Sequence, residues 1–385
     1  MQAQTTAAAA AETGSSVLRL QQQGITRKLK PVSNGEKGFT EIPTLDVSAM
    51  YSDRLADRVK LANAVRDAAT RVGFMQINNH GISQQIIDDA FAEAEKFFQL
   101  PAEEKEKLHQ NKNKDFQGYE PLYYTNVGGL KRGDCKESFS YGYDPAYDAN
   151  GDGKMPSILQ RHNQWPDESV APKYKSTMIR YQQALLALAR QFIRIFALAL
   201  YLPEDYFDNK LGHPIAGVRV LHYPPMEGSD DEEIGLGAHT DIECFTIINQ
   251  TYTDYPALEV LNADGEWIKL FAEPGCFVVN LGDMMMRMTN DAFLSTVHRV
   301  INRGDSERYS IPFFFGINAD ELIGTLPSCI TEDNPQKYDP VTIFDHSRKR
   351  LFAARPNHPL SKTLVNTLPK KYIVQNGVPV YPEEQ

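Results

Sequence analysis

Three short apolar runs decide the fold of this chain: Cys244-Phe-Thr-Ile-Ile248, Cys276-Phe-Val-Val-Asn-Leu281 and Tyr309-Ser-Ile-Pro-Phe-Phe-Phe315. Each has the length of a β-strand and is rich in β-branched and aromatic residues. Similar runs occupy residues 218–223 and 258–261, and Asn262-Ala-Asp-Gly265 is a hairpin signal between two runs. Strand-sized runs at this spacing, separated by turns, predict an antiparallel sandwich or barrel from residue 217 onward.

Helical periodicity is the main pattern before residue 217. Apolar residues recur at steps of three and four in residues 53–70, 84–98 and 173–200. Residues 73–77 predict a strand between the first two helices, and Ser83 is a suitable N-cap for the second. The apolar stripe of residues 173–200 is interpreted as a packing face. A mixed α/β region is therefore expected to precede the β-rich core.

The expected organisation has four parts. Residues 1–40 are predicted to be a disordered leader, because the tract 1–16 is rich in Ala, Thr and Gln and has no apolar core. Residues 41–170 form the N-terminal α/β region, and residues 171–353 form a long helix followed by the β core. Residues 354–385 are a C-terminal tail rich in Pro, Lys and Asn.

Bulk properties exclude several classes of partner. The formal charge of −10, with no long Lys/Arg cluster, argues against nucleic acid. No run approaches the ~18 consecutive apolar residues of a membrane span, so no membrane partner is expected. None of the four cysteines stands in a C-x-x-C pair, which predicts a reduced, cytoplasmic setting. The sequence does not indicate an oligomeric state.

The segment Gly237-Ala-His239-Thr-Asp241 carries two metal-ligand types at a spacing of two. On an extended backbone such residues point the same way, with Cα atoms about 6.8 Å apart. His298 is the candidate third ligand. Two imidazoles and one carboxylate on one face of an octahedron leave three positions open, as Fe(II) oxygenases require. The alternative is a core histidine beside a turn aspartate, since H-x-D alone is common.

Arg308-Tyr-Ser310 stands at the start of an apolar run. On a strand, Arg308 and Ser310 share a face and Tyr309 takes the other. A guanidinium beside a hydroxyl suits one carboxylate, which the arginine can bind through two parallel hydrogen bonds. The alternative is a surface arginine at the entry of a strand.

With these motifs in place, the sequence resembles the iron(II)/2-oxoglutarate-dependent dioxygenases of the isopenicillin N synthase type. The resemblance runs from about Ile42 to Asp345 and implies a mainly β fold with flanking helices, built on a double-stranded β-helix (jelly-roll) core. The motifs that carry it keep the family's order and spacing: Gly73-Phe74, Asn79-His-Gly81, Asp134-Cys-Lys-Glu137, Asn163-Gln-Trp-Pro166, Tyr223-Pro224, His239-Thr-Asp241, Pro274-Gly275, Asn280-Leu-Gly-Asp283, Thr289-Asn290, His298-Arg-Val300 and Arg308-Tyr-Ser310.

The resemblance also implies a chemistry. Fe(II) would be bound by His239, Asp241 and His298, and 2-oxoglutarate would be the cosubstrate. With O₂ it would give succinate, CO₂ and an iron(IV)-oxo species that abstracts hydrogen from a small organic, specialised-metabolite type of substrate. The residues implied to hold the distal carboxylate of 2-oxoglutarate are Arg308 and Ser310, with help from Tyr223.

Some positions depart from the family pattern. Leu221-His-Tyr-Pro224 replaces the usual Asn-Tyr-Tyr-Pro, Glu243 replaces a small residue, and Met288 replaces a common Trp. Neither His222 nor His80 is assigned a metal role, and Asp283 is expected to stabilise a turn. Two other functions stay open: an oxidase that uses Fe(II) and O₂ without 2-oxoglutarate, and a catalytically inactive jelly-roll that serves as a binding module.

An apolar substrate pocket is expected, because a strong oxidant must be kept away from water. Its candidate residues come from the Tyr-rich loop and from the strands near the metal motif. For each of them the alternative is ordinary packing in the core. The candidates are Phe116, Tyr119, Tyr123, Tyr124, Phe245 and Phe315.

Overall fold

The structure, a computed structural model, describes residues 38–361 except positions 114, 128–129, 154, 157–158, 160–161, 226–232, 304, 356–357 and 360. Outside that range it describes two hairpins, β1 (Val17–Leu20) with β2 (Ile25–Lys28) and β17 (Ile373–Gln375) with β18 (Val378–Val380). The first hairpin lies within residues 1–40, where the sequence predicts a disordered leader. Residues 1–16 and most of the predicted tail 354–385 lie outside the described residues.

Eight strands form the larger sheet, in the order β3-β4-β12-β9-β14-β7-β6-β5. Neighbouring strands are antiparallel except β3 and β4, which are parallel. The strands are β3 (Thr44–Asp46), β4 (Phe74–Asn78), β5 (Gly118–Glu120), β6 (Glu137–Tyr141), β7 (Pro214–Tyr223), β9 (Phe245–Gln250), β12 (Phe277–Leu281) and β14 (Arg308–Asn318).

Four antiparallel strands form the smaller sheet, in the order β11-β10-β13-β8. A further short pair, β15 (Leu322–Ile323) and β16 (Val341–Thr342), precedes the last helix. The four strands of the sheet are β8 (Glu233–His239), β10 (Leu258–Leu261), β11 (Trp267–Leu270) and β13 (His298–Asn302).

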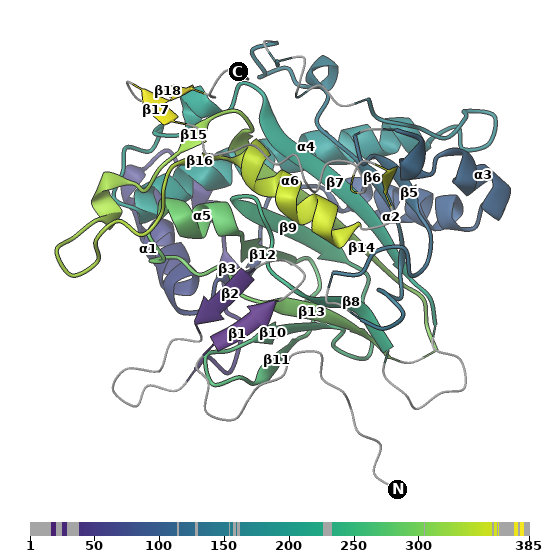
Figure 1. Cartoon of the computed structure of the whole chain (residues 1–385), viewed down its shortest axis with the longest axis horizontal. Coiled ribbons are helices and arrows are strands. Elements are labelled where there is room, and N and C mark those ends of the chain that lie inside the picture. The colour runs from purple at the N-terminus through teal and green to yellow at the C-terminus, as the bar shows by residue number, and fades with distance from the viewer. Residues whose placement is uncertain are drawn as a thin grey trace, which may run out of the picture.

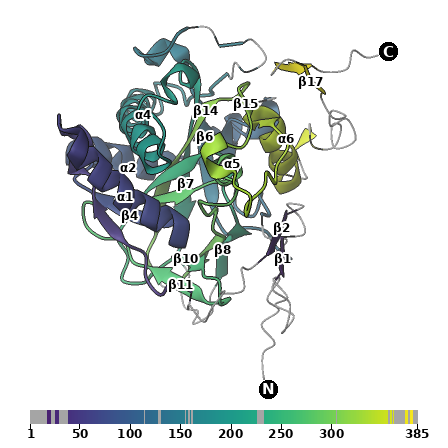
Figure 2. The ribbon, with the colours of Figure 1, turned by 90° about the vertical axis from the view of Figure 1, so that its left-hand side faces the viewer.

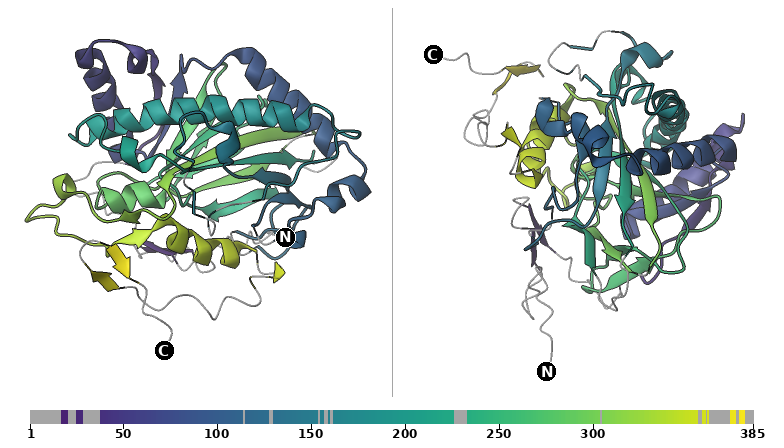
Figure 3. Two further views of the ribbon diagram at one scale, coloured as in Figure 1. Left: turned by 90° about the horizontal axis from the view of Figure 1, so that it is seen from above. Right: turned by 90° about the vertical axis from the view of Figure 1, so that its right-hand side faces the viewer.

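Helices cover one face of the larger sheet. The helix predicted for residues 173–200 is confirmed as α4, and it lies across that sheet (Figure 3). Its apolar stripe packs with α1, α2 and the sheet in one buried cluster, and these three helices gather on one side of the molecule (Figure 2). The helices are α1 (Leu55–Arg71), α2 (Gln84–Phe98), α3 (Ala102–Lys107), α4 (Tyr174–Ala199), α5 (Asp283–Met288) and α6 (Ile343–Ala354).

The other face of the larger sheet meets the smaller sheet. A second apolar cluster joins the two sheets, with Phe74, Leu221 and Ile248 from the larger one and Val260 and Val300 from the smaller one. The helix α6 crosses in front of β9 and β14 in Figure 1. Two facing sheets with helices on the outside give the jelly-roll arrangement that the sequence predicts. No described helix is long and apolar enough to span a membrane.

Pro312 lies inside β14, between β9 and β7, although proline is usually confined to sheet edges and bulges. It pairs with Ile248 of β9, but the pairing with β7 passes from Ser310 directly to Phe313. Because proline has no N–H to donate, the row of hydrogen bonds between β14 and β7 is interrupted at this position. Strand alternation continues through the break, so Pro312 stays on the same face as Ser310.

Candidate active site

The ends of two paired strands bring three metal-ligand candidates together. His239 ends β8 and His298 begins β13, and the two residues are register partners. Asp241 lies two residues beyond the end of β8, and its Oδ1 lies 3.6 Å from Nε2 of His239 and 3.9 Å from Nε2 of His298. One ligand atom from each residue falls within 4.8 Å of the others. The three side chains can therefore reach one ion.

Backbone carbonyls orient both imidazoles. Nδ1 of His239 lies 2.8 Å from the Gly237 carbonyl oxygen, and Nδ1 of His298 lies 3.2 Å from that of Thr296. A carbonyl only accepts hydrogen bonds, so each Nδ1 carries the proton and each Nε2 presents a lone pair. This is the second-sphere pattern that fixes histidine ligands in metal sites.

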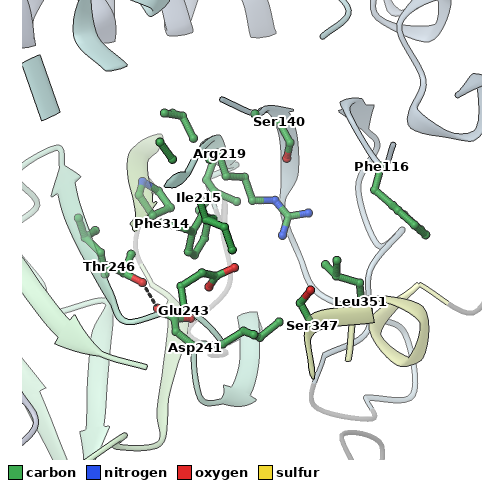
Figure 4. Close-up of a pocket in the computed structure, with 18 of the residues that line it drawn as sticks. Phe116, Ser140, Ile215, Arg219, Asp241, Glu243, Thr246, Phe314, Ser347 and Leu351 are labelled. Carbon is green, nitrogen blue, oxygen red and sulfur yellow. Dashed lines mark hydrogen bonds between the residues drawn. The ribbon is translucent and has the colours of Figure 1, made fainter. Parts of the chain in front are cut away.

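The carboxylate of Asp241 is held through one oxygen. Its Oδ2 accepts hydrogen bonds from the hydroxyl of Thr246 on β9 and, at 2.7 Å, from the amide of Asn280 on β12. Figure 4 shows the first of these bonds as a dashed line. The two donors leave Oδ1 facing the imidazoles, so Asp241 is set to bind an ion through a single oxygen.

The electrostatics of the cluster favour the protonation states that bind metal. Burial, together with the neighbouring His298, lowers the pKa of His239 and keeps its imidazole neutral. Burial alone would raise the pKa of Asp241. Coulomb attraction to His298 and His239 in their protonated forms, together with the hydrogen bonds from Asn280 and Thr246, outweighs burial, and the pKa of Asp241 lies below its ordinary value. A neutral imidazole and an ionised carboxylate are the ligand forms of these side chains.

Arg350 of α6 hydrogen-bonds to the backbone of the segment that carries His239 and Asp241. Its guanidinium donates to the backbone carbonyl of Thr240 and, at 3.4 Å, to that of Asp241. It also forms a buried ion pair with Asp283, which accepts a 2.6 Å hydrogen bond from Ser295. Asp283 is therefore structural, as the sequence predicts, although its partner is a distant arginine and not a turn.

Arg308, Ser310 and Tyr223 lie together at one end of the same space. Arg308 and Tyr223 are register partners on β14 and β7, with the guanidinium carbon 4.8 Å from the centre of the tyrosine ring. Nη2 of Arg308 donates to Gln250, whereas Nη1 is buried and has no hydrogen-bond partner among the described residues. A buried guanidinium with an unused donor beside a hydroxyl is suited to a carboxylate from outside the chain.

A cavity of about 290 Å³ contains both groups and lies between the sheets and α6. Alternate residues of two neighbouring strands line it, because side chains on one face of a strand recur every second position. The residues of α6 that line it include Ser347 and Leu351, which Figure 4 shows beside the cavity. The lining residues that follow this alternation are Arg308, Ser310, Pro312 and Phe314 of β14 and Ile215, Gly217, Arg219, Leu221 and Tyr223 of β7; Pro214, Ala216 and Val218 of β7 also border the cavity.

Comparison with known proteins decides the family. The model of the 2OG-Fe(II) oxygenase superfamily matches residues 214–317, and the model of the non-haem dioxygenase in morphine synthesis N-terminal region matches residues 42–168. The 2-oxoglutarate-Fe(II) type oxidoreductase ppzC of Metarhizium rileyi is 37% identical over 327 residues, which cover 81% of this chain and 87% of that relative. The chain belongs to the 2OG-Fe(II) oxygenase superfamily.

Solved structures agree with this assignment. A 2OG-Fe(II) oxygenase family protein from Caulobacter crescentus matches with a TM-score of 0.70 at 29% identity, covering 81% of this oxygenase and 99% of that chain. A full-length Neurospora crassa protein, solved in complex with alpha-KG and thymine, matches with a TM-score of 0.69 at 26% identity, covering 81% and 96%. The predicted jelly-roll fold, enzyme class and use of Fe(II) and 2-oxoglutarate are confirmed.

The oxygenase places one of the predicted pocket aromatics in the cavity lining, namely Phe116. Phe245 and Phe315 lie on the helix-facing side of the larger sheet, where their rings pack at 5.1 Å and Phe245 contacts Phe192 and Phe196 of α4. Strand alternation gives the reason, since Phe314 and not Phe315 shares the face of Arg308 and Ser310.

The tyrosines of the loop also serve other contacts. Tyr119 is buried and donates a 2.6 Å hydrogen bond to Glu137. The guanidinium of Arg132 lies over the ring of Tyr123, 4.2 Å from its centre, and Tyr124 donates to Asn111. None of the three tyrosines belongs to the described lining of the cavity.

Two histidines without an assigned metal role lie away from the ligand cluster. His222 faces the opposite side of β7 from Tyr223, stacks on Tyr309 and lies 2.8 Å from Glu137. His80 stacks on Phe277 at 4.0 Å. Both rings therefore pack against aromatic neighbours, and His222 also has a polar contact with Glu137.

Several lining residues were not found from the sequence. Strand alternation could have identified Arg219, because it lies four residues before Tyr223 on β7 and therefore shares the same face. Arg350 and Leu351 come from a helix about a hundred residues after the metal motif, and no local pattern connects them with it. The sequence marks Glu243 only as a departure from the family pattern. Burial, with the nearby Asp241, raises the pKa of Glu243 to about 7.

Proposed function

We propose that His239, Asp241 and His298 bind the Fe(II) of this oxygenase. The observation that carries the proposal is the convergence of two oriented Nε2 atoms and one carboxylate oxygen at the paired ends of β8 and β13. Two nitrogens and one oxygen on one side of an ion match the facial triad of non-haem Fe(II) oxygenases. The hydrogen bonds to both Nδ1 atoms and to Oδ2 hold these ligand atoms in place before metal binds.

We further propose that Arg308, Ser310 and Tyr223 hold the distal carboxylate of 2-oxoglutarate. The unused Nη1 donor of buried Arg308 supports this assignment, because a buried donor needs a partner. Gln250 fixes the other side of the guanidinium and so aims Nη1 at the cavity. Ser310 and Tyr223 add their hydroxyls to the same end of the cavity.

The reaction proposed is oxidation of one C–H bond of a small organic, specialised-metabolite type of substrate. When bound, Fe(II) and 2-oxoglutarate with O₂ supply the oxidising chemistry, and 2-oxoglutarate leaves as succinate and CO₂. The chain contributes binding and orientation: the ligand cluster at one side, the carboxylate-binding end at another, and an apolar lining that includes Ile215, Phe314 and Leu351. This lining excludes water from the reacting groups.

A cytoplasmic location remains part of the proposal. It is supported by the four cysteines, Cys135, Cys244, Cys276 and Cys329, all of which are free thiols in the structure. Free thiols are typical of proteins in a reducing compartment.

An anaerobic Fe(II) titration tests the ligand assignment. The wild-type chain is expected to bind one Fe(II), and addition of 2-oxoglutarate is expected to give the visible charge-transfer absorption of an Fe(II)–2-oxoglutarate complex. His239→Ala should lose both signals, whereas His162→Ala, which removes an exposed imidazole, should keep both. Stoichiometric Fe(II) binding by His239→Ala would refute the assignment. Succinate formation with and without 2-oxoglutarate then separates this function from an oxidase that needs none.

A further inference from the structure

Glu243 is an acidic side chain inside the substrate cavity with no assigned role. It lines the cavity, and Figure 4 shows its carboxylate pointing into the space that Phe314, Ile215 and Arg219 border. The backbone N–H groups of Ile242 and of Glu243 itself donate to this carboxylate, but no described side chain donates a hydrogen bond to it or forms an ion pair with it. An acid in a largely apolar cavity is costly unless something compensates its charge.

The backbone of Glu243 is fixed, so the side chain does not reach the cavity by chance. The N–H of Met284, in the first turn of α5, donates to the Glu243 carbonyl oxygen at 3.3 Å. Gly282 packs so tightly against the same residue that an added Cβ would lie 2.2 Å from the Glu243 carbonyl oxygen. The close approach of Gly282 and α5 leaves the cavity as the open direction for the side chain.

Apart from Arg308, the guanidinium groups that line the cavity form ion pairs with acids other than Glu243. Arg219 and Arg355 share Glu120 of β5, which also lies 3.6 Å from Lys136. Arg350 is paired with Asp283 and bonded to the backbone of the metal motif. Among the described contacts, none of these guanidinium groups forms an ion pair with Glu243.

The proposed metal and cosubstrate do not neutralise the negative charge of Glu243 either. Fe(II), a 2-oxoglutarate dianion, Asp241 and Arg308 together carry no net charge. Glu243 therefore remains as an additional acid beside a balanced centre, on the side of the cavity that a substrate would occupy. The group that fits it is one that brings N–H donors and positive charge.

We propose that Glu243 is a specificity-determining residue that binds a basic nitrogen of the substrate, a protonated amine or an amidine. This inference rests on the proposed function, because it treats the cavity as the substrate site of an Fe(II)/2-oxoglutarate centre. It narrows the substrate class to nitrogen-containing small molecules that fit the part of the cavity, about 290 Å³ in all, that 2-oxoglutarate leaves open. The apolar residues opposite Glu243 would contact the carbon skeleton.

The test compares three probes of similar size and different charge: benzylamine, benzyl alcohol and benzoate. Each is titrated anaerobically into protein loaded with Fe(II) and 2-oxoglutarate, and binding is followed by calorimetry and by the shift of the charge-transfer absorption. Wild type is expected to bind benzylamine at least about 10-fold more tightly than benzyl alcohol, the ratio expected of one charge-assisted hydrogen bond, and to bind benzoate weakest.

The isosteric variant Glu243→Gln is expected to reduce the amine preference to less than about 2-fold. Glu332→Gln, which removes an exposed acid, should keep the wild-type preference. The proposal is overturned if wild type binds no probe amine, if benzyl alcohol or benzoate binds as tightly as benzylamine, or if Glu243→Gln keeps the preference. Failure of the Fe(II)–2-oxoglutarate absorption to form in wild type is a separate outcome, which rejects the proposed function itself.

Discussion

Replacement of Thr246 by valine tests whether the groups around Asp241 hold it in position for metal. Valine has nearly the same shape as threonine and lacks the hydroxyl that donates to Oδ2 of Asp241. Asn280 still donates to the same oxygen at 2.7 Å, so the carboxylate keeps one of two restraints. Loss of a single second-sphere donor typically weakens metal binding 10- to 100-fold. This corresponds to about 1.4–2.8 kcal/mol of binding free energy.

A second effect must be separated from the first. A hydrogen bond to a charged group contributes about 1.5–3 kcal/mol to folding, so Thr246→Val is also expected to unfold more easily without metal. That loss occurs in the apo and the loaded protein alike and cancels in the binding equilibrium. The change in Fe(II) affinity therefore reports the orientation of Oδ1, whereas the change in apo stability reports the lost bond.

The assay is anaerobic Fe(II) calorimetry on Thr246→Val and on a matched control, Thr125→Val. The hydroxyl of Thr125 is equally buried but has no hydrogen-bond partner among the described residues, so its removal should leave Fe(II) affinity within about 2-fold of wild type. If Thr246→Val binds Fe(II) as tightly as Thr125→Val does, Oδ2 anchoring does not position the ligand, and the reasoning fails.

Three further outcomes are expected. Arg308→Gln should raise the dissociation constant for 2-oxoglutarate about 10- to 100-fold and leave Fe(II) affinity within about 2-fold, measured by titration of the charge-transfer absorption; equal losses for both would place Arg308 at the metal. Arg350→Met removes the arginine partner of buried Asp283 and should lower the unfolding free energy by about 3–5 kcal/mol in chemical denaturation, whereas Arg54→Met, at an exposed site, should not; equal stability of the two variants contradicts a stabilising role for Arg350. Phe245→Ala should lower the unfolding free energy by about 3–5 kcal/mol, because Phe245 packs in the core under α4. Phe314→Ala should lower it less and should instead change probe binding, because Phe314 lines the cavity. A larger loss of stability in Phe314→Ala than in Phe245→Ala would contradict these two positions.

The ligand cluster shows how far a local rule reaches. The spacing of His239 and Asp241 needs only the alternation of an extended chain, and the order of the motifs supplied His298. Alternation does not predict the register between β8 and β13. The pairing of His298 with His239 depends on that register in the smaller sheet. The three-way convergence therefore follows from the fold and not from the motif alone.

Strand alternation explains where the pocket aromatics lie. Placing Arg308 and Ser310 on one face of a strand also places Pro312 and Phe314 there and sends Phe315 to the other face. The same alternation turns Phe245 away from the site, since its neighbour Thr246 contacts Asp241. Both phenylalanines instead fill the core under α4.

Contacts between distant segments could not be read from the sequence. Arg350 reaches the metal motif from α6, and Glu120 collects Arg219 and Arg355 from two other parts of the chain. Such contacts depend on how separate elements pack, for which a single sequence carries no periodic signal. Pro312 illustrates the opposite case, in which a local rule favours an edge and the sheet accommodates proline by losing pairing on one side.

The most direct test of the account is an anaerobic crystal structure of the Fe(II)-loaded protein with anomalous diffraction measured at the iron edge. One iron peak per chain is expected, within coordination distance of Nε2 of His239, Oδ1 of Asp241 and Nε2 of His298. An iron peak that lacks any one of these three atoms, or a peak at another place in the chain, would contradict the ligand assignment.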